Sequence, residues 1–134
     1  MSLNYPDHAA LLYEALRPDP YFAAMESWVE HGSARDAMLA YYDFSMREAL
    51  EYGRLHLPGE TQYGVSIWLT PLDDERALEK KRRREAFLAE RFGSTVLDRY
   101  RDIVALMSAN SASLVDERAW YLSIVGVSPR YQNR

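Results

Sequence analysis

The spacing of apolar residues changes partway along the chain, from a helical repeat to alternation. Only a fold that contains both helices and strands can bury both sets of apolar residues. Upstream, apolar residues recur at helical spacing: Met38, Tyr42, Met46, Ala49 and Leu50. In "YGVSIWLT" (63–70) they alternate, which places four on one face: Tyr63, Val65, Ile67 and Leu69. The sequence therefore predicts an α+β domain.

Two short helices are predicted before residue 33, with ends set by proline and glycine. Pro6 and Pro18 bracket the first, over about residues 7–17, and the second covers about residues 21–31. Gly32 suits a C-terminal cap, since glycine adopts the left-handed backbone conformation without strain.

Ser33 begins the third and most clearly amphipathic helix, which runs to about residue 52. Asp36 follows three residues later, an arrangement that resembles a capping box. We interpret the aromatic-rich stretch "AYYDFSMREALEY" as core and interface. The alternative is that one of its rings lines a ligand pocket: Tyr41, Tyr42 or Phe44.

A hairpin and two further helices follow. "RLHL" (54–57) and residues 63–70 flank the loop "PGETQ", which predicts two antiparallel strands. Acidic residues at 73–75 favour the start of a helix that runs to about Phe92, where Gly93 closes it.

The next helix starts at Ser94 and has an apolar stripe of Val96, Leu97, Tyr100, Ile103, Val104 and Met107. "SANSASLVDER" is then predicted to be a polar connector. The last strand, 120–127, is apolar on both faces, a pattern typical of a central strand rather than an edge strand.

The composition favours one globular domain over residues 1–134. Hydrophobic residues make up 48% and aromatic residues 13%, and a chain of this length can bury a single core. The net charge of −4 argues against nucleic-acid binding, which needs clustered Lys and Arg. The absence of Cys excludes disulfides and a cysteine nucleophile. With no signal-peptide or membrane-span pattern, we expect a cytoplasmic protein that does not bind membranes.

The sequence contains two sets of ionisable residues that could form sites. The run "EKKRRRE" (79–85) is interpreted as a solvated helix face, because its glutamates can pair with cations one turn away. The alternative is contact with the phosphates of a ligand or with an acidic partner. The spacing of His8, His31 and His56 predicts no metal site.

The stretch "WYLSIVGVSPRYQNR" (120–134) carries the most specific pattern. It consists of an apolar strand, a turn at Ser128 and Pro129, and a polar segment containing Gln132. This order resembles the acetyl-CoA motif of the GNAT family of N-acetyltransferases, in which a strand ends in a Val–Asp/Ser–Pro step, followed by Gln or Arg and then two glycines that open a helix. The match covers these residues well and the preceding element order loosely, and it stops before the glycines.

The resemblance implies a GNAT-like fold: helices, an antiparallel hairpin, two inserted helices and a central cofactor strand. In such enzymes the strand pairs its main chain with the pantetheine arm of acetyl-CoA, and the following loop receives the diphosphate. It assigns six cofactor-binding residues: Ile124, Val125, Val127, Gln132, Asn133 and Arg134. Gly126, inside a branched run, suggests a bulge or the close approach of another backbone.

The implied reaction is transfer of an acetyl group from acetyl-CoA to a primary amine of a small molecule or peptide. A strand N–H near Val125 or Val127 would stabilise the oxyanion. No catalytic residue carries over, because Ser123 stands where some family members place a Glu, and Tyr121 is also a poor base at neutral pH. The acceptor is left open.

Because the motif stops at Arg134, we expect the chain to be the N-terminal portion of such a domain, with very weak acetyl-CoA binding and little or no turnover. An unpaired strand edge would favour a homodimer. The alternative function is a non-catalytic, helix-rich interaction or regulatory module whose last strand pairs with a partner.

Overall fold

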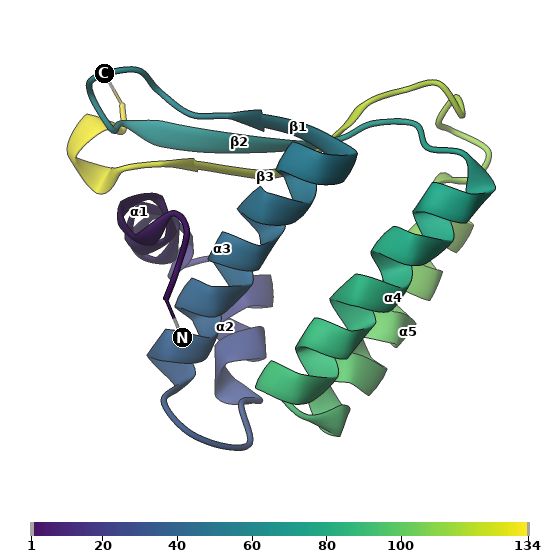
Figure 1. The fold of residues 1–134 in the computed structure, drawn as a ribbon, viewed down its shortest axis with the longest axis horizontal. Coiled ribbons are helices and arrows are strands. Elements are labelled where there is room, and N and C mark those ends of the chain that lie inside the picture. The colour runs from purple at the N-terminus through teal and green to yellow at the C-terminus, as the bar shows by residue number, and fades with distance from the viewer. Residues whose placement is uncertain (1, 134) are drawn as a thin grey trace.

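The computed structural model describes residues 2–133, and over these residues the fold is α+β (Figure 1). Five α-helices and a three-stranded antiparallel sheet follow one another in the predicted order of helices, hairpin, helices and strand. Figure 1 shows α1 and α3 lying against one side of the sheet, while α4 and α5 form a separate helical hairpin beside α3.

The three N-terminal helices are α1 (Pro6–Leu16), α2 (Pro20–Ser27) and α3 (Ala34–Tyr52). The predicted cap of α3 is confirmed, because the Ser33 hydroxyl accepts a hydrogen bond from the Asp36 N–H at 3.2 Å. Among the apolar residues expected on the buried face of α3, Leu50 is an exception, since it is 67% exposed.

Helix α2 ends earlier than predicted, at Ser27 rather than near residue 31. Downstream residues instead contact the turn between α4 and α5: the Glu30 N–H donates to the Phe92 carbonyl at 3.4 Å, and the Glu30 carboxylate accepts from the Thr95 N–H at 3.2 Å. These contacts between distant parts of the chain replace the last predicted helical turn. Gly32 has a φ of 76° in the turn before α3.

The sheet consists of β1 (Gly53–His56), β2 (Gly64–Leu69) and β3 (Tyr121–Val127), in that order. Both pairings are antiparallel, so the predicted hairpin is confirmed. Strand β1 follows α3 without a linker, and Gly53 makes this junction possible. A Cβ atom at Gly53 would lie 2.2 Å from the Trp68 carbonyl oxygen, closer than any side chain tolerates.

Strand β3 lies at the edge of this sheet within residues 2–133, not at its centre as predicted. Its apolarity on both faces led to that prediction. Only Ile124 and Gly126 are buried, whereas Val125 and Val127 point to the opposite face and are 51% and 37% exposed. The exposed strand edge expected from the sequence is present in the part of the chain that the structure describes.

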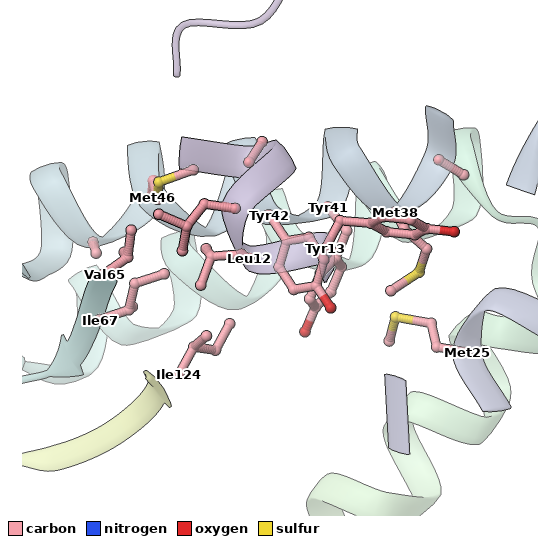
Figure 2. Packing of buried hydrophobic residues seen from close by; sticks show 14 of the residues in the cluster. Leu12, Tyr13, Met25, Met38, Tyr41, Tyr42, Met46, Val65, Ile67 and Ile124 are labelled. Carbon is pink, nitrogen blue, oxygen red and sulfur yellow. The ribbon is translucent and has the colours of Figure 1, made fainter. Parts of the chain in front are cut away.

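The core lies between α1, α3 and the inner face of the sheet. Figure 2 shows Val65, Ile67 and Ile124 gathered near Leu12 of α1, and Met46 of α3 lies above them. At the other end of the core α2 contributes Met25. Tyr41 and Tyr42 are both buried in this cluster, which fits their interpretation as core residues.

Helices α4 (Asp74–Arg91) and α5 (Ser94–Ser111) form an antiparallel hairpin, separated by Gly93 with a φ of 103°. Helix α5 extends into the stretch predicted to be a connector. Its serines and alanines do not interrupt a helix, and the Ser111 hydroxyl donates to the Met107 carbonyl at 2.8 Å. The last two residues of the predicted stripe, Val104 and Met107, are 40% and 49% exposed.

The basic run 79–85 divides between surface and interior. Arg83 pairs with Glu79 at 2.8 Å and with Glu51 at 2.7 Å, as expected of a solvated face. Arg84, however, is buried, so the interpretation of the run as wholly solvated is wrong at this position. The two cations before Arg83 are exposed: Lys81 and Arg82.

Candidate functional site

A pocket with a volume of about 570 Å³ opens at the C-terminal end of β3. It is lined by the end of α1, the last residues of β3, and the 3-10 turn η1 (Pro129–Tyr131) with the residues after it. Eight residues line it: Ala15, Leu16, Val125, Gly126, Val127, Tyr131, Gln132 and Asn133.

Helix α1 approaches β3 closely at Gly126. A Cβ atom there would lie 2.7 Å from Leu12 Cδ2 and 3.4 Å from Ala15 Cβ. Gly126 therefore marks a close approach, one of its two predicted meanings, but the approaching group is a side chain of α1 rather than another backbone. The glycine allows the end of α1 to form a wall of the pocket.

The sheet irregularity lies not at Gly126 but three residues earlier. Ile67 pairs with Ile124, whereas Trp68 pairs with Leu122, so Ser123 is the extra residue of a β-bulge. A bulge strengthens the local twist and leaves the extra residue outside the regular ladder. The bulge bends β3 just before the segment that lines the pocket.

The register of β3 determines which main-chain groups face outward. The Ser128 N–H donates to the Tyr63 carbonyl at 2.7 Å, which continues the ladder one step past Val127. Antiparallel strands alternate residues that bond the neighbour with residues whose N–H and C=O point away. Val125 and Val127 therefore direct their main-chain groups to the free edge, beside the pocket.

The residues after β3 form a compact turn. The Tyr131 N–H donates to the Ser128 carbonyl at 2.8 Å, and the Gln132 side-chain amide donates to the Val127 carbonyl at 2.9 Å. Asn133 has a φ of 64°, the left-handed conformation that asparagine tolerates better than most residues. Gln132 thus fixes the turn against the end of the strand.

Four of the six predicted cofactor-binding residues line this pocket: Val125, Val127, Gln132 and Asn133. Ile124 does not, because its side chain is buried in the core at 6% exposure. Arg134 lies outside the described residues. Sequence reasoning missed Ala15 and Leu16, which no local signal connects with a strand more than a hundred positions away.

The aromatic residues of α3 lie outside this pocket. The three residues named as the alternative ligand-pocket residues do not line the pocket at β3: Tyr41, Tyr42 and Phe44. Within residues 2–133 no three His, Asp or Glu side chains are arranged to hold a metal ion. None of the helices in the same range is long and apolar enough to cross a bilayer.

No protein-family model matches the chain, and a search of curated proteins finds no match.

Proposed function

We propose that the chain carries the coenzyme-binding strand of an N-acetyltransferase that transfers an acetyl group from acetyl-CoA to a primary amine. The observation that carries this proposal is the pocket at the end of β3. It joins Val125 and Val127, whose main-chain groups face the free edge, with Gln132 and Asn133 of the following turn.

The free edge of β3 suits the pantetheine arm of the coenzyme. That arm contains two amides. The free edge offers them the N–H and C=O of Val125 and the N–H of Val127, while the Val127 carbonyl already accepts from the Gln132 amide. The apolar wall formed by Ala15 and Leu16 would contact the methylene and gem-dimethyl groups of the arm. The turn at Gln132 and Asn133 would then lie toward the diphosphate.

Transfer requires an amine held against the thioester and a donor for the developing oxyanion. The outward N–H of Val125 is the group we assign to the oxyanion, because it lies on the free edge close to the bulge at Ser123. Neither Ser123 nor Tyr121 can act as a strong base at neutral pH, so we assign no catalytic base.

Binding is expected to be weak, because the described residues form walls on only part of the pocket. We expect a dissociation constant on the order of 1 mM for acetyl-CoA, equivalent to about −4 kcal/mol, and little or no acetyl transfer.

Filling the pocket tests the proposal. Ala15→Phe places a ring against its α1 wall, whereas Ala77→Phe adds the same ring to an exposed position of α4. In saturation-transfer NMR with millimolar acetyl-CoA, we expect Ala15→Phe to remove the coenzyme signal and Ala77→Phe to retain it. Equal signals from both variants, with both folded by circular dichroism, would contradict the proposal.

A second candidate function is favoured by the same exposed edge. A non-catalytic interaction module would pair β3 with a strand of a partner or of a second copy, and β3 contains no charge or proline to prevent such pairing. The pocket-filling variant separates the two functions, since Ala15 lies on α1 and not on the strand edge.

A further inference from the structure

The outer face of the sheet is covered by no helix or strand of residues 2–133. Figure 1 shows α1 and α3 against one face of the sheet and nothing against the other. The register places six side chains on the open face: Arg54 and His56 of β1, Ser66 and Trp68 of β2, and Leu122 and Val125 of β3. Val127 and Trp120 extend it. We call this surface the outer sheet face.

The outer sheet face is apolar along β3 and β2. Leu122 is 39% exposed and Trp120 is 52% exposed. Trp68 lies between them and β1, and its indole N–H donates to the Ser66 hydroxyl at 3.2 Å. This combination of neighbouring aliphatic and indole surface is typical of a protein interface.

The outer sheet face also differs in charge from the rest of the protein. The chain has a net charge of −4, yet the three strands contain no Asp or Glu. Arg54 provides the positive charge, and its guanidinium carbon lies 5.9 Å from the centre of the Trp120 ring. His56 lies two residues further along β1.

We propose that the outer sheet face binds an acidic amphipathic helix of a partner protein. An amphipathic helix covers one face of a sheet with its apolar stripe, and carboxylates on its flank would pair with Arg54 along β1. A second copy related by two-fold symmetry fits poorly, because each copy would bring Arg54 and His56 to the same interface. The overall negative charge disfavours an anionic membrane.

This surface adjoins the pocket, because Val125 and Val127 line the pocket and also belong to the outer sheet face. The test therefore uses Leu122 and Arg54, which do not line the pocket. Its failure would leave the coenzyme proposal intact, and failure of the coenzyme proposal would not affect the outer sheet face.

The probe is a fluorescent helical peptide of about 18 residues with leucines at helical spacing and glutamates on its other faces. The control peptide has lysines in place of the glutamates. Anisotropy titrations at low salt should show saturable binding of the glutamate peptide, about tenfold tighter than binding of the lysine peptide. Added salt should weaken it.

Two variants with matched controls locate the binding. Leu122→Ala should weaken the glutamate peptide about tenfold, whereas Leu106→Ala, at an exposed leucine of α5, should not. Arg54→Glu should reverse the preference, so that the lysine peptide binds more tightly than the glutamate peptide. Arg82→Glu on α4 should leave the preference unchanged. Because Arg82→Glu makes the same change in net charge, a reversal confined to Arg54→Glu, with both variants folded by circular dichroism, locates the effect on the outer sheet face.

Several outcomes would overturn the proposal. The proposal fails if the glutamate peptide shows no saturable binding, or if Arg54→Glu still prefers the glutamate peptide to the lysine peptide. The proposal also fails if light scattering shows a dimer that Leu122→Ala dissociates, since the occupant is then a second copy. Competition by vesicles of anionic lipid at equal strength would assign the surface to a membrane instead.

Discussion

The buried guanidinium of Arg84 binds both carboxylate oxygens of Glu48, and this pair fastens the α4–α5 hairpin to α3. Arg84 Nη2 lies 2.9 Å from Glu48 Oε1, and Nε lies 3.1 Å from Oε2. Nη2 also donates to the Ser45 hydroxyl at 3.0 Å. The Tyr41 and Phe44 rings lie 5.2 and 5.1 Å from the guanidinium carbon. Within residues 2–133 no fully buried side-chain nitrogen or oxygen atom lacks a hydrogen-bond partner, those of Arg84 included.

Removing one member of this pair should be costly. Glu48→Gln leaves a buried cation without its counter-charge, and we expect the free energy of unfolding to fall by about 3 kcal/mol in urea titrations. The control is the exposed pair of Arg83 with Glu51, for which Arg83→Met should cost no more than about 1 kcal/mol. Similar losses for the two variants would show that burial adds nothing to the Arg84 pair.

The junction between α3 and β1 should tolerate only glycine. Gly53→Ala places its Cβ against the Trp68 carbonyl oxygen, so α3 or β2 must shift, and we expect a loss of about 3 kcal/mol or an unfolded chain. Gly59→Ala, at a loop glycine with open space around it, should change stability by less than about 1 kcal/mol. Thermal melting of both variants tests this, and a stable Gly53→Ala protein would contradict it.

The contact of α1 with β3 predicts a compensating pair. Gly126→Ala brings its Cβ against Leu12 Cδ2, and we expect a loss of about 2 kcal/mol. Leu12→Ala alone should cost about 3 kcal/mol, because it leaves a cavity in the core. In the double variant the new methyl group partly fills that cavity, so the combined loss should be smaller than the sum. Strict additivity in urea titrations would count against this contact.

Stability should fall at alkaline pH. Burial raises the pKa of Tyr100 to about 12, and it also raises the pKa values of Tyr21 and Tyr42 above 10.0, the value of a free tyrosine. These groups favour folding fully below pH 10, and that contribution is lost as pH rises through their folded pKa values.

Urea titrations between about pH 9 and 11.5 measure this dependence. Tyr100→Phe should flatten the fall in the free energy of unfolding, whereas Tyr63→Phe, at a tyrosine that is 52% exposed, should leave it unchanged. If the free energy of unfolding falls equally steeply with pH in the two variants, Tyr100 ionises as readily in the folded protein as in the unfolded chain.

Local signals predicted most of the elements, because caps and periodicity act between residues close in sequence. Ser33 caps α3 as expected, and alternation in residues 63–70 identified β2. The end of α2 was predicted wrongly because Glu30 bonds to residues more than sixty positions away. Contacts between residues so far apart in the sequence cannot be predicted from a local pattern.

The candidate site was predicted in part for the same reason. Gln132 and Asn133 follow the strand directly, so a motif could indicate them. The wall formed by Ala15 and Leu16 arises only when α1 crosses β3, and the bulge at Ser123 depends on pairing with β2. The burial of Arg84 likewise depends on Glu48, on another helix, and a run of charges by itself indicates a solvated surface.

The most direct measurement of the central claim is a titration of the ¹⁵N-labelled protein with coenzyme A, followed by amide chemical shifts. We predict that shifts concentrate at Val125, Val127, Gln132 and Asn133, together with Ala15 across the pocket, and that they saturate only in the millimolar range. The absence of shifts at these residues at saturating coenzyme, or shifts confined to another surface, would contradict the assignment of β3 as the coenzyme-binding strand.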